Sequence, residues 1–111
     1  MLKCGTTTAE AKSGYGLSEE GELAILNVIA RVGKETPLRT VGTFLGLHAV
    51  PPEYYGDHDG YVRHVCEDLV PLVAARKLAD YVDAFVEEGY FTHDDARLLS
   101  TAAKAHGLGV R

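Results

Sequence analysis

The sequence predicts an α/β fold built on a parallel β-sheet, and three observations support this. Short β-branched or apolar runs recur along the chain, and a turn signal follows each of them. Each turn leads into a stretch with the three- and four-residue apolar spacing of a helix. Strands that alternate with helices in this way form parallel sheets. The predicted order is three consecutive βα units followed by the start of a fourth strand.

The first unit begins with a strand predicted at residues 6–12, which the Ser13-Gly14-Tyr15-Gly16 run breaks. Ser18 is a suitable N-cap for the helix that follows. Glu19, Glu20 and Glu22 then place negative charge at the positive end of the helix dipole. We expect Gly33, followed by Thr36-Pro37, to end this helix.

The second unit begins with a strand predicted at residues 38–47. Pro51-Pro52 terminates the sheet pairing after it, because proline has no N–H to donate. A second helix is predicted from about Asp59, with apolar residues spaced three and four apart. Pro71 falls inside this apolar region. We expect it to begin a new helical segment, at the first position, where a missing N–H leaves no bond unmade.

The third unit begins with a strand predicted at residues 81–86, and Glu87-Glu88-Gly89 closes it. Thr92 is a good N-cap for the third helix, and acidic residues occupy its first turn. Gly107 is well placed just after the end of that helix. Residues 109–111 then have the character of a fourth strand.

Three such units with helices on one side leave the other face of the sheet open. In a closed barrel, side chains from all the strands fill that face. We expect Val41, Phe44 and Val82 to lie on the open face without those partners. The pattern therefore favours a piece of a barrel. A doubly wound sheet, with helices on both faces, is the structural alternative.

Composition excludes several classes of protein. The chain has 111 residues and a formal net charge of −5, and its Lys and Arg residues form no basic run, so we expect no nucleic-acid partner. No apolar run is long enough for a membrane span, so we expect no membrane partner. Cys4 and Cys66 lie in unrelated contexts, and we interpret them as reduced thiols of a cytoplasmic protein.

Function in parallel α/β folds resides at the C-terminal ends of the strands. Tyr15 lies in the first such loop, His48 in the second, and Glu87 and Glu88 in the third. Each also has a structural interpretation: a tyrosine that closes the mouth of the barrel, a histidine that donates to a nearby carbonyl, and two solvated charges. The residues alone name no reaction.

The other four histidines do not cluster in the sequence, and no H-x-H or H-E-x-x-H spacing occurs. We expect all four to be surface residues, namely His58, His64, His93 and His106.

Two long motifs resemble the imidazolonepropionase family of metal-dependent amidohydrolases. The run from Gly5 to Leu17 is similar to the family's GTTT-x-E-x-KSGYGL. The run from Thr43 to Tyr54 is similar to its TFLGAHAVPPEY and departs from it only at Leu47. Residues 82–89 and 103–108 resemble two further family segments, so the resemblance covers essentially the whole chain in one register.

The resemblance implies a partial TIM-like (β/α) barrel. Residues 1–111 would be a fragment of the catalytic barrel, from about strand 2 to the start of strand 5. The family hydrolyses 4-imidazolone-5-propanoate to N-formimidoyl-L-glutamate in histidine degradation, and it uses zinc or iron. Its metal ligands lie on barrel strands outside this chain. We therefore expect no metal ligand, no catalytic residue, no bound cofactor and no activity in the isolated fragment.

Two substrate contacts follow from the matching motifs. Tyr15 corresponds to the family's substrate-binding tyrosine, and His48 corresponds to its substrate-binding histidine. The small-molecule substrate is the implied partner, and the full-length enzyme is expected to form a homodimer. Two rival hypotheses remain. One is another cyclic-amide hydrolase or aminohydrolase of the same superfamily, and the other is a stand-alone non-enzymatic α/β module.

Overall fold

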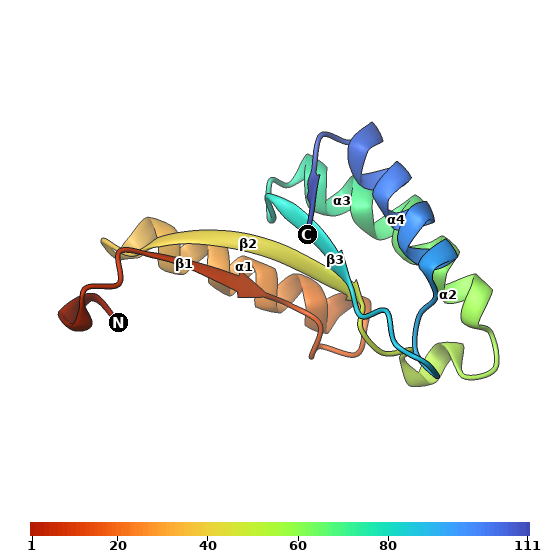
Figure 1. Cartoon of the computed structure of the whole chain (residues 1–111). Coiled ribbons are helices and arrows are strands. Elements are labelled where there is room, and N and C mark those ends of the chain that lie inside the picture. Colours follow the sequence, from red (N-terminus) through yellow and green to blue (C-terminus); the bar gives the residue numbers. More distant parts are fainter.

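A four-stranded parallel sheet forms the centre of the structure, a computed structural model that describes all 111 residues (Figure 1). The strands lie in the order in which they occur along the chain, and each neighbouring pair is parallel. They are β1 (Thr8–Lys12), β2 (Arg39–Leu47), β3 (Tyr81–Ala84) and β4 (Gly109–Val110). The α/β prediction of three βα units and the start of a fourth strand is therefore confirmed.

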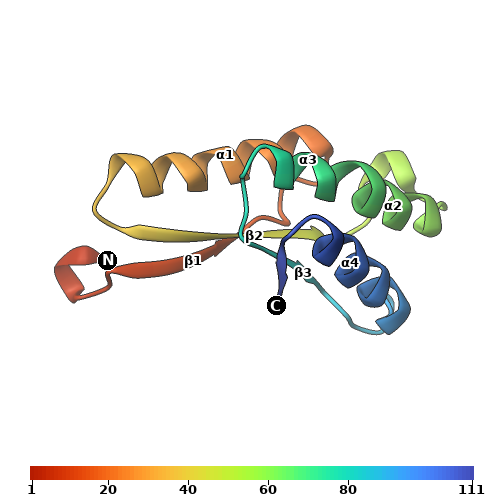
Figure 2. The same cartoon turned by 90° about the horizontal axis from the view of Figure 1, so that it is seen from above.

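The helices cover one side of this sheet (Figure 2). They are α1 (Glu19–Glu35), α2 (His58–His64), the π-helical turn η3 (Val65–Leu69), α3 (Val70–Ala75) and α4 (His93–Ala105). Two short 3-10 turns, η1 (Leu2–Cys4) and η2 (Pro52–Tyr54), complete the chain. Strands in sequential order with helices on a single face are the arrangement of consecutive units in a (β/α) barrel. A doubly wound sheet would place helices on both faces. No helix combines the length and hydropathy that crossing a membrane requires.

A single cluster of 16 buried apolar residues fills the space between the sheet and the helices. Phe44 is 1% exposed and Val82 is 0% exposed, and both belong to this cluster. The expectation that they would lie on the open face was therefore wrong. Side chains alternate along a strand, and Thr43 takes the open face, so Val41 shares that face while Phe44 points toward the helices.

The predicted helix caps are confirmed. The Ser18 hydroxyl accepts a hydrogen bond from the Gly21 N–H at 3.0 Å at the start of α1. Thr92 and Asp95 form a capping box at the start of α4. Gly107 follows the last residues of α4 with φ of 76°, a left-handed conformation that glycine adopts without strain.

Helix α1 ends at Glu35 with Thr36 as its C-cap, so the predicted stop at Thr36-Pro37 is confirmed, whereas the helix continues through Gly33. The glycine has a different role. A Cβ atom at Gly33 would lie 2.3 Å from the Thr40 hydroxyl, so the missing side chain lets α1 pack closely against β2. The glycine therefore reflects packing between helix and strand and not a helix end.

Pro71 lies within an almost continuous helical path. A new helical segment begins one residue earlier than expected, at Val70, and it follows η3 without a break in the helical backbone. The Val70 N–H bonds to the Val65 carbonyl, the wider spacing of a π turn. That wider turn takes up the irregularity that a proline causes inside a helix.

Candidate functional site

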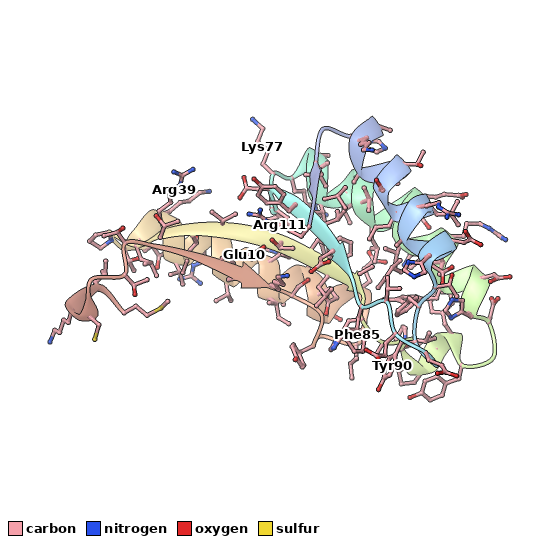
Figure 3. The ribbon with its side chains drawn as sticks, viewed as in Figure 1. Glu10, Arg39, Lys77, Phe85, Tyr90 and Arg111 are labelled. Atoms are coloured by element: carbon pink, nitrogen blue, oxygen red, sulfur yellow. The ribbon has the colours of Figure 1, made fainter.

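Four aromatic rings form a row at the C-terminal edge of the sheet. Tyr15 follows β1, His48 follows β2, and Phe85 follows β3. The Tyr15 and His48 ring centroids are 4.8 Å apart, those of His48 and Phe85 are 5.8 Å apart, and those of Phe85 and Tyr90 are 4.9 Å apart. All three pairs are edge-to-face, the arrangement that aromatic quadrupoles favour. Figure 3 shows Phe85 and Tyr90 beside each other beyond the end of β3. The structure thus brings Tyr15 and His48 together.

The His48 ring is oriented by a backbone carbonyl. Its Nδ1 lies 2.6 Å from the Gly14 oxygen. A carbonyl oxygen only accepts hydrogen bonds, so Nδ1 carries the proton in this bond. The other ring nitrogen, Nε2, has no hydrogen-bond partner within the chain. In the neutral ring, Nε2 is therefore an acceptor available to a ligand. The carbonyl bond expected for a structural histidine is present, and it leaves the second ring nitrogen, Nε2, without a partner.

The loop with Tyr15 is fastened by a buried glutamate from α1. Glu22 is 4% exposed, and its carboxylate accepts from the Gly14 N–H at 2.9 and 2.7 Å and from the Gly16 N–H at 2.7 Å. The Tyr15 side chain between these glycines is 78% exposed. A fixed backbone therefore presents a phenol ring to the solvent beside His48.

Both glycines of this loop are required by its geometry. Gly14 has φ of +108°, which side chains disfavour. A Cβ atom at Gly16 would lie 2.3 Å from the backbone carbon of Gly21 and 2.4 Å from the Glu22 nitrogen. The loop therefore lies directly against the first turn of α1.

A polar network occupies the open face of the sheet. The Thr43 hydroxyl donates to the Glu10 Oε1 at 2.6 Å, and the Arg111 Nε donates to the same oxygen at 3.2 Å. Figure 3 shows Glu10 and Arg111 next to each other on this face. The hydrogen bond from Thr43 lowers the pKa of Glu10 below its usual value. The Arg111 guanidinium also lies 3.7 Å from the centre of the Tyr81 ring.

An ion pair continues this network toward the site. The Lys12 Nζ lies 2.6 Å from the Asp83 Oδ2. The hydrogen bond to Asp83 raises the pKa of Lys12 above its usual value. Sequence reasoning missed the network. The signal was the spacing of two between Glu10 and Lys12, which places both side chains on one face of β1.

Glu87 and Glu88 are exposed, and neither side chain makes a hydrogen bond or an ion pair. The Tyr90 N–H donates to the Glu87 carbonyl at 3.0 Å, which closes the turn after β3. Their geometry is that of two solvated charges.

The remaining histidines only partly match the expectation that they lie on the surface. His93 and His106 are exposed, whereas His58 and His64 are half-buried, and their ring nitrogens contact carboxylates. The His58 Nε2 lies 2.9 Å from the Asp95 Oδ2. Burial acts to raise the pKa of Asp95, but hydrogen bonds from Thr92 and His58 outweigh it, so the pKa is lowered.

No three His, Cys, Asp or Glu side chains lie close enough together to hold a metal ion. The residues present therefore do not fit a zinc or iron centre. A groove of about 730 Å³ lies between α2 and α4 and includes neither Tyr15 nor His48.

No protein-family model matches the chain. An imidazolonepropionase from Geobacillus thermodenitrificans (strain NG80-2) is 54% identical over 108 residues, which are 97% of this chain and 26% of that protein. One from Solibacter usitatus (strain Ellin6076) is 48% identical over 111 residues, which are 100% of this chain and 27% of that protein. One from Christiangramia forsetii is 46% identical over 108 residues, again 97% of this chain and 26% of that protein. The chain thus spans about a quarter of the length of the curated relatives it matches. Over that segment, the chain is similar along essentially its whole length to proteins named imidazolonepropionase.

Proposed function

We propose that this chain forms part of the substrate-binding site of an enzyme that hydrolyses 4-imidazolone-5-propanoate to N-formimidoyl-L-glutamate in histidine degradation. The observation that supports it best is the contact between Tyr15 and His48, whose ring centroids are 4.8 Å apart. These residues come from the two motifs that most resemble the family. In this proposal the chain is a segment of a longer (β/α) barrel, from about strand 2 to the start of strand 5.

The chemistry of the two side chains suits this substrate. Hydrolysis of the ring develops negative charge on its carbonyl oxygen, and the exposed Tyr15 hydroxyl can donate a hydrogen bond to that oxygen. His48 keeps its proton on Nδ1, facing Gly14, so its neutral Nε2 can accept from a ring N–H of the substrate. The two residues would then hold different atoms of the imidazolone ring.

Zinc or iron in this proposal is held by other parts of the barrel, because the chain has no donor set for a metal. A cytoplasmic location and a homodimeric full-length enzyme stay predictions. The alternative hypothesis, that the substrate is another cyclic amide, is tested by the same assay.

The test uses the protein expressed from the complete reading frame that contains these residues. Hydrolysis is measured as the loss of the ring absorbance of 4-imidazolone-5-propanoate. We expect His48→Asn to reduce kcat/KM on the order of 100-fold, because the asparagine amide can still donate to Gly14 while the acceptor at Nε2 is lost. Tyr15→Phe should reduce kcat/KM at least about tenfold.

The matched control is Tyr55→Phe, since Tyr55 is 75% exposed, much like Tyr15, and lies in no aromatic pair. It should leave kcat/KM unchanged. Wild-type protein that opens a different cyclic amide but not the imidazolone would overturn the proposed substrate. An active protein in which both site variants retain wild-type kcat/KM would overturn the proposed site.

A further inference from the structure

Glu22 is a buried carboxylate that bonds to the backbone on both sides of Tyr15. It is 4% exposed and lies in the first turns of α1. It makes no ion pair with a lysine, arginine or histidine, and it accepts hydrogen bonds from the N–H groups of Gly14 and Gly16. Both oxygens are used, because Oε1 accepts from both glycines and Oε2 from Gly14. Such charge-assisted bonds are among the stronger ones in proteins.

Gly14 connects this carboxylate to His48. Its N–H is held by Glu22, and its carbonyl oxygen lies 2.6 Å from the His48 Nδ1. The carbonyl position decides which ring nitrogen carries the proton in neutral His48, because a bonded carbonyl requires N–H at Nδ1. A shift of Gly14 would therefore change both the orientation of the ring and the chemical character of Nε2.

The hydrogen bonds from Gly14 and Gly16 to Glu22 also fix the position of Tyr15. The residue lies between two glycines whose N–H groups point at one carboxylate, and Gly16 is further constrained by backbone contact with Gly21. The exposed phenol has no hydrogen-bond partner of its own, so its position depends on the backbone that Glu22 fixes and on its contact with His48.

We infer that Glu22 is a positioning residue of the imidazolone site, which acts through Gly14 on the tautomer of His48 and through both glycines on Tyr15. This inference rests on the proposed function. It goes beyond it by assigning a role to a side chain that does not face the substrate. Precise placement of this kind matters because small displacements of a binding group reduce the rate strongly.

The experiment uses Glu22→Gln in the full-length protein. Glutamine keeps the shape and one acceptor oxygen but brings an N–H₂ group against the Gly14 N–H, where Glu22 has an oxygen at 2.7 Å. We expect kcat/KM to fall about 10- to 100-fold. Glu22→Asp keeps both acceptor oxygens on a shorter arm and should recover part of that loss. Glu20 is an exposed carboxylate on the same helix and makes no hydrogen bond or ion pair, so Glu20→Gln should change kcat/KM less than about twofold.

A second measurement separates positioning from general stabilisation. ¹⁵N spectra of histidine-labelled protein report which ring nitrogen is protonated, and His48→Asn assigns the His48 signals. Wild-type and Glu20→Gln protein should show His48 with its proton on Nδ1. Folded Glu22→Gln protein should show a shift toward the Nε2–H form.

Wild-type His48 spectra and wild-type kcat/KM in a folded Glu22→Gln protein would overturn the inference. If the wild-type protein does not hydrolyse the imidazolone, the proposed function fails separately, and the His48 spectrum alone decides the role of Glu22. If Glu22→Gln does not fold, Glu22→Asp is judged by the same two measurements. Loss of folding in both variants would also overturn the inference, because Glu22 would then be part of the scaffold.

Discussion

Replacing Thr43 by valine tests what holds the polar network on the open face of the sheet. Thr43 is fully buried, and its hydroxyl donates to the Glu10 carboxylate at 2.6 Å. Valine keeps the shape of threonine and removes the donor. A hydrogen bond to a charged acceptor is worth about 1.5–3 kcal/mol. The Glu10 side chain is 33% exposed, and solvent screening reduces this, so we expect the free energy of unfolding to fall by about 1 kcal/mol at neutral pH.

The sign of the pH dependence follows from Glu10. Its pKa in the folded protein is lowered from 4.5, first of all by the bond from Thr43. A lowered pKa means that the bond stabilises the fold above the unfolded pKa, and that this stability is lost as the pH falls through the folded pKa. The deficit of Thr43→Val should therefore be largest at neutral pH and should shrink in acid below 4.5.

Urea unfolding at neutral and acidic pH measures the deficit, and ¹³C NMR of the Glu10 carboxyl measures its pKa, which should be higher in Thr43→Val. Thr40→Val is the matched control on the same strand. The Thr40 hydroxyl donates to the neutral Ile29 carbonyl at 3.1 Å, so its removal should cost the same at both pH values. The reasoning is refuted if Glu10 titrates identically in wild-type and Thr43→Val protein.

Three further predictions concern packing and reactivity. Phe44→Ala should lower the free energy of unfolding by about 3–5 kcal/mol in urea titrations, since Phe44 is 1% exposed, and a loss under about 1.5 kcal/mol would contradict its place in the core. Gly16→Ala should lower the free energy of unfolding by about 2–3 kcal/mol, because its Cβ would lie 2.3 Å from the backbone of Gly21. The control is Gly89→Ala, whose Cβ would meet no other atom but whose φ is +82°, and it should lower the free energy of unfolding by about 1 kcal/mol. Equal losses in the two variants would argue against the close contact at Gly16. Burial raises the pKa of Cys66 to about 11, so iodoacetamide at mildly alkaline pH should alkylate the exposed Cys4 at least about tenfold faster, as followed by mass spectrometry, and equal rates would contradict this.

The order of elements was predictable because local chemistry specifies it. The Ser18 and Thr92 hydroxyls and the glycine at 107 mark helix ends through bonds that span only a few residues. The faces of the strands were harder to predict. Phe44 was expected on the open face, but β2 carries apolar side chains on both of its faces, Val41 on one and Phe44 on the other, so alternation alone does not show which face meets the helices.

The candidate site was predictable in part. Tyr15 and His48 meet because parallel neighbouring strands end at the same edge of the sheet. Phe85 was missed because the predicted strand at 81–86 included it, whereas β3 ends at Ala84. Glu22 was interpreted only as a charge near the helix dipole. Its reach back to the Tyr15 loop depends on where that loop lies in space, which no spacing in the sequence reveals.

The open face of the sheet carries two ion pairs, Glu10 with Arg111 and Lys12 with Asp83. Arg39 shares this face with Val41 and Thr43 and adds a positive charge without an acidic partner at the start of β2. Strands that close a barrel over the two pairs would need polar groups there but no net countercharge, whereas an acidic group opposite Arg39 would compensate its charge. Because Glu10, Lys12, Asp83 and Arg111 are already paired, a charged group of a ligand bound at the C-terminal ends of these strands would need a counterion from other residues.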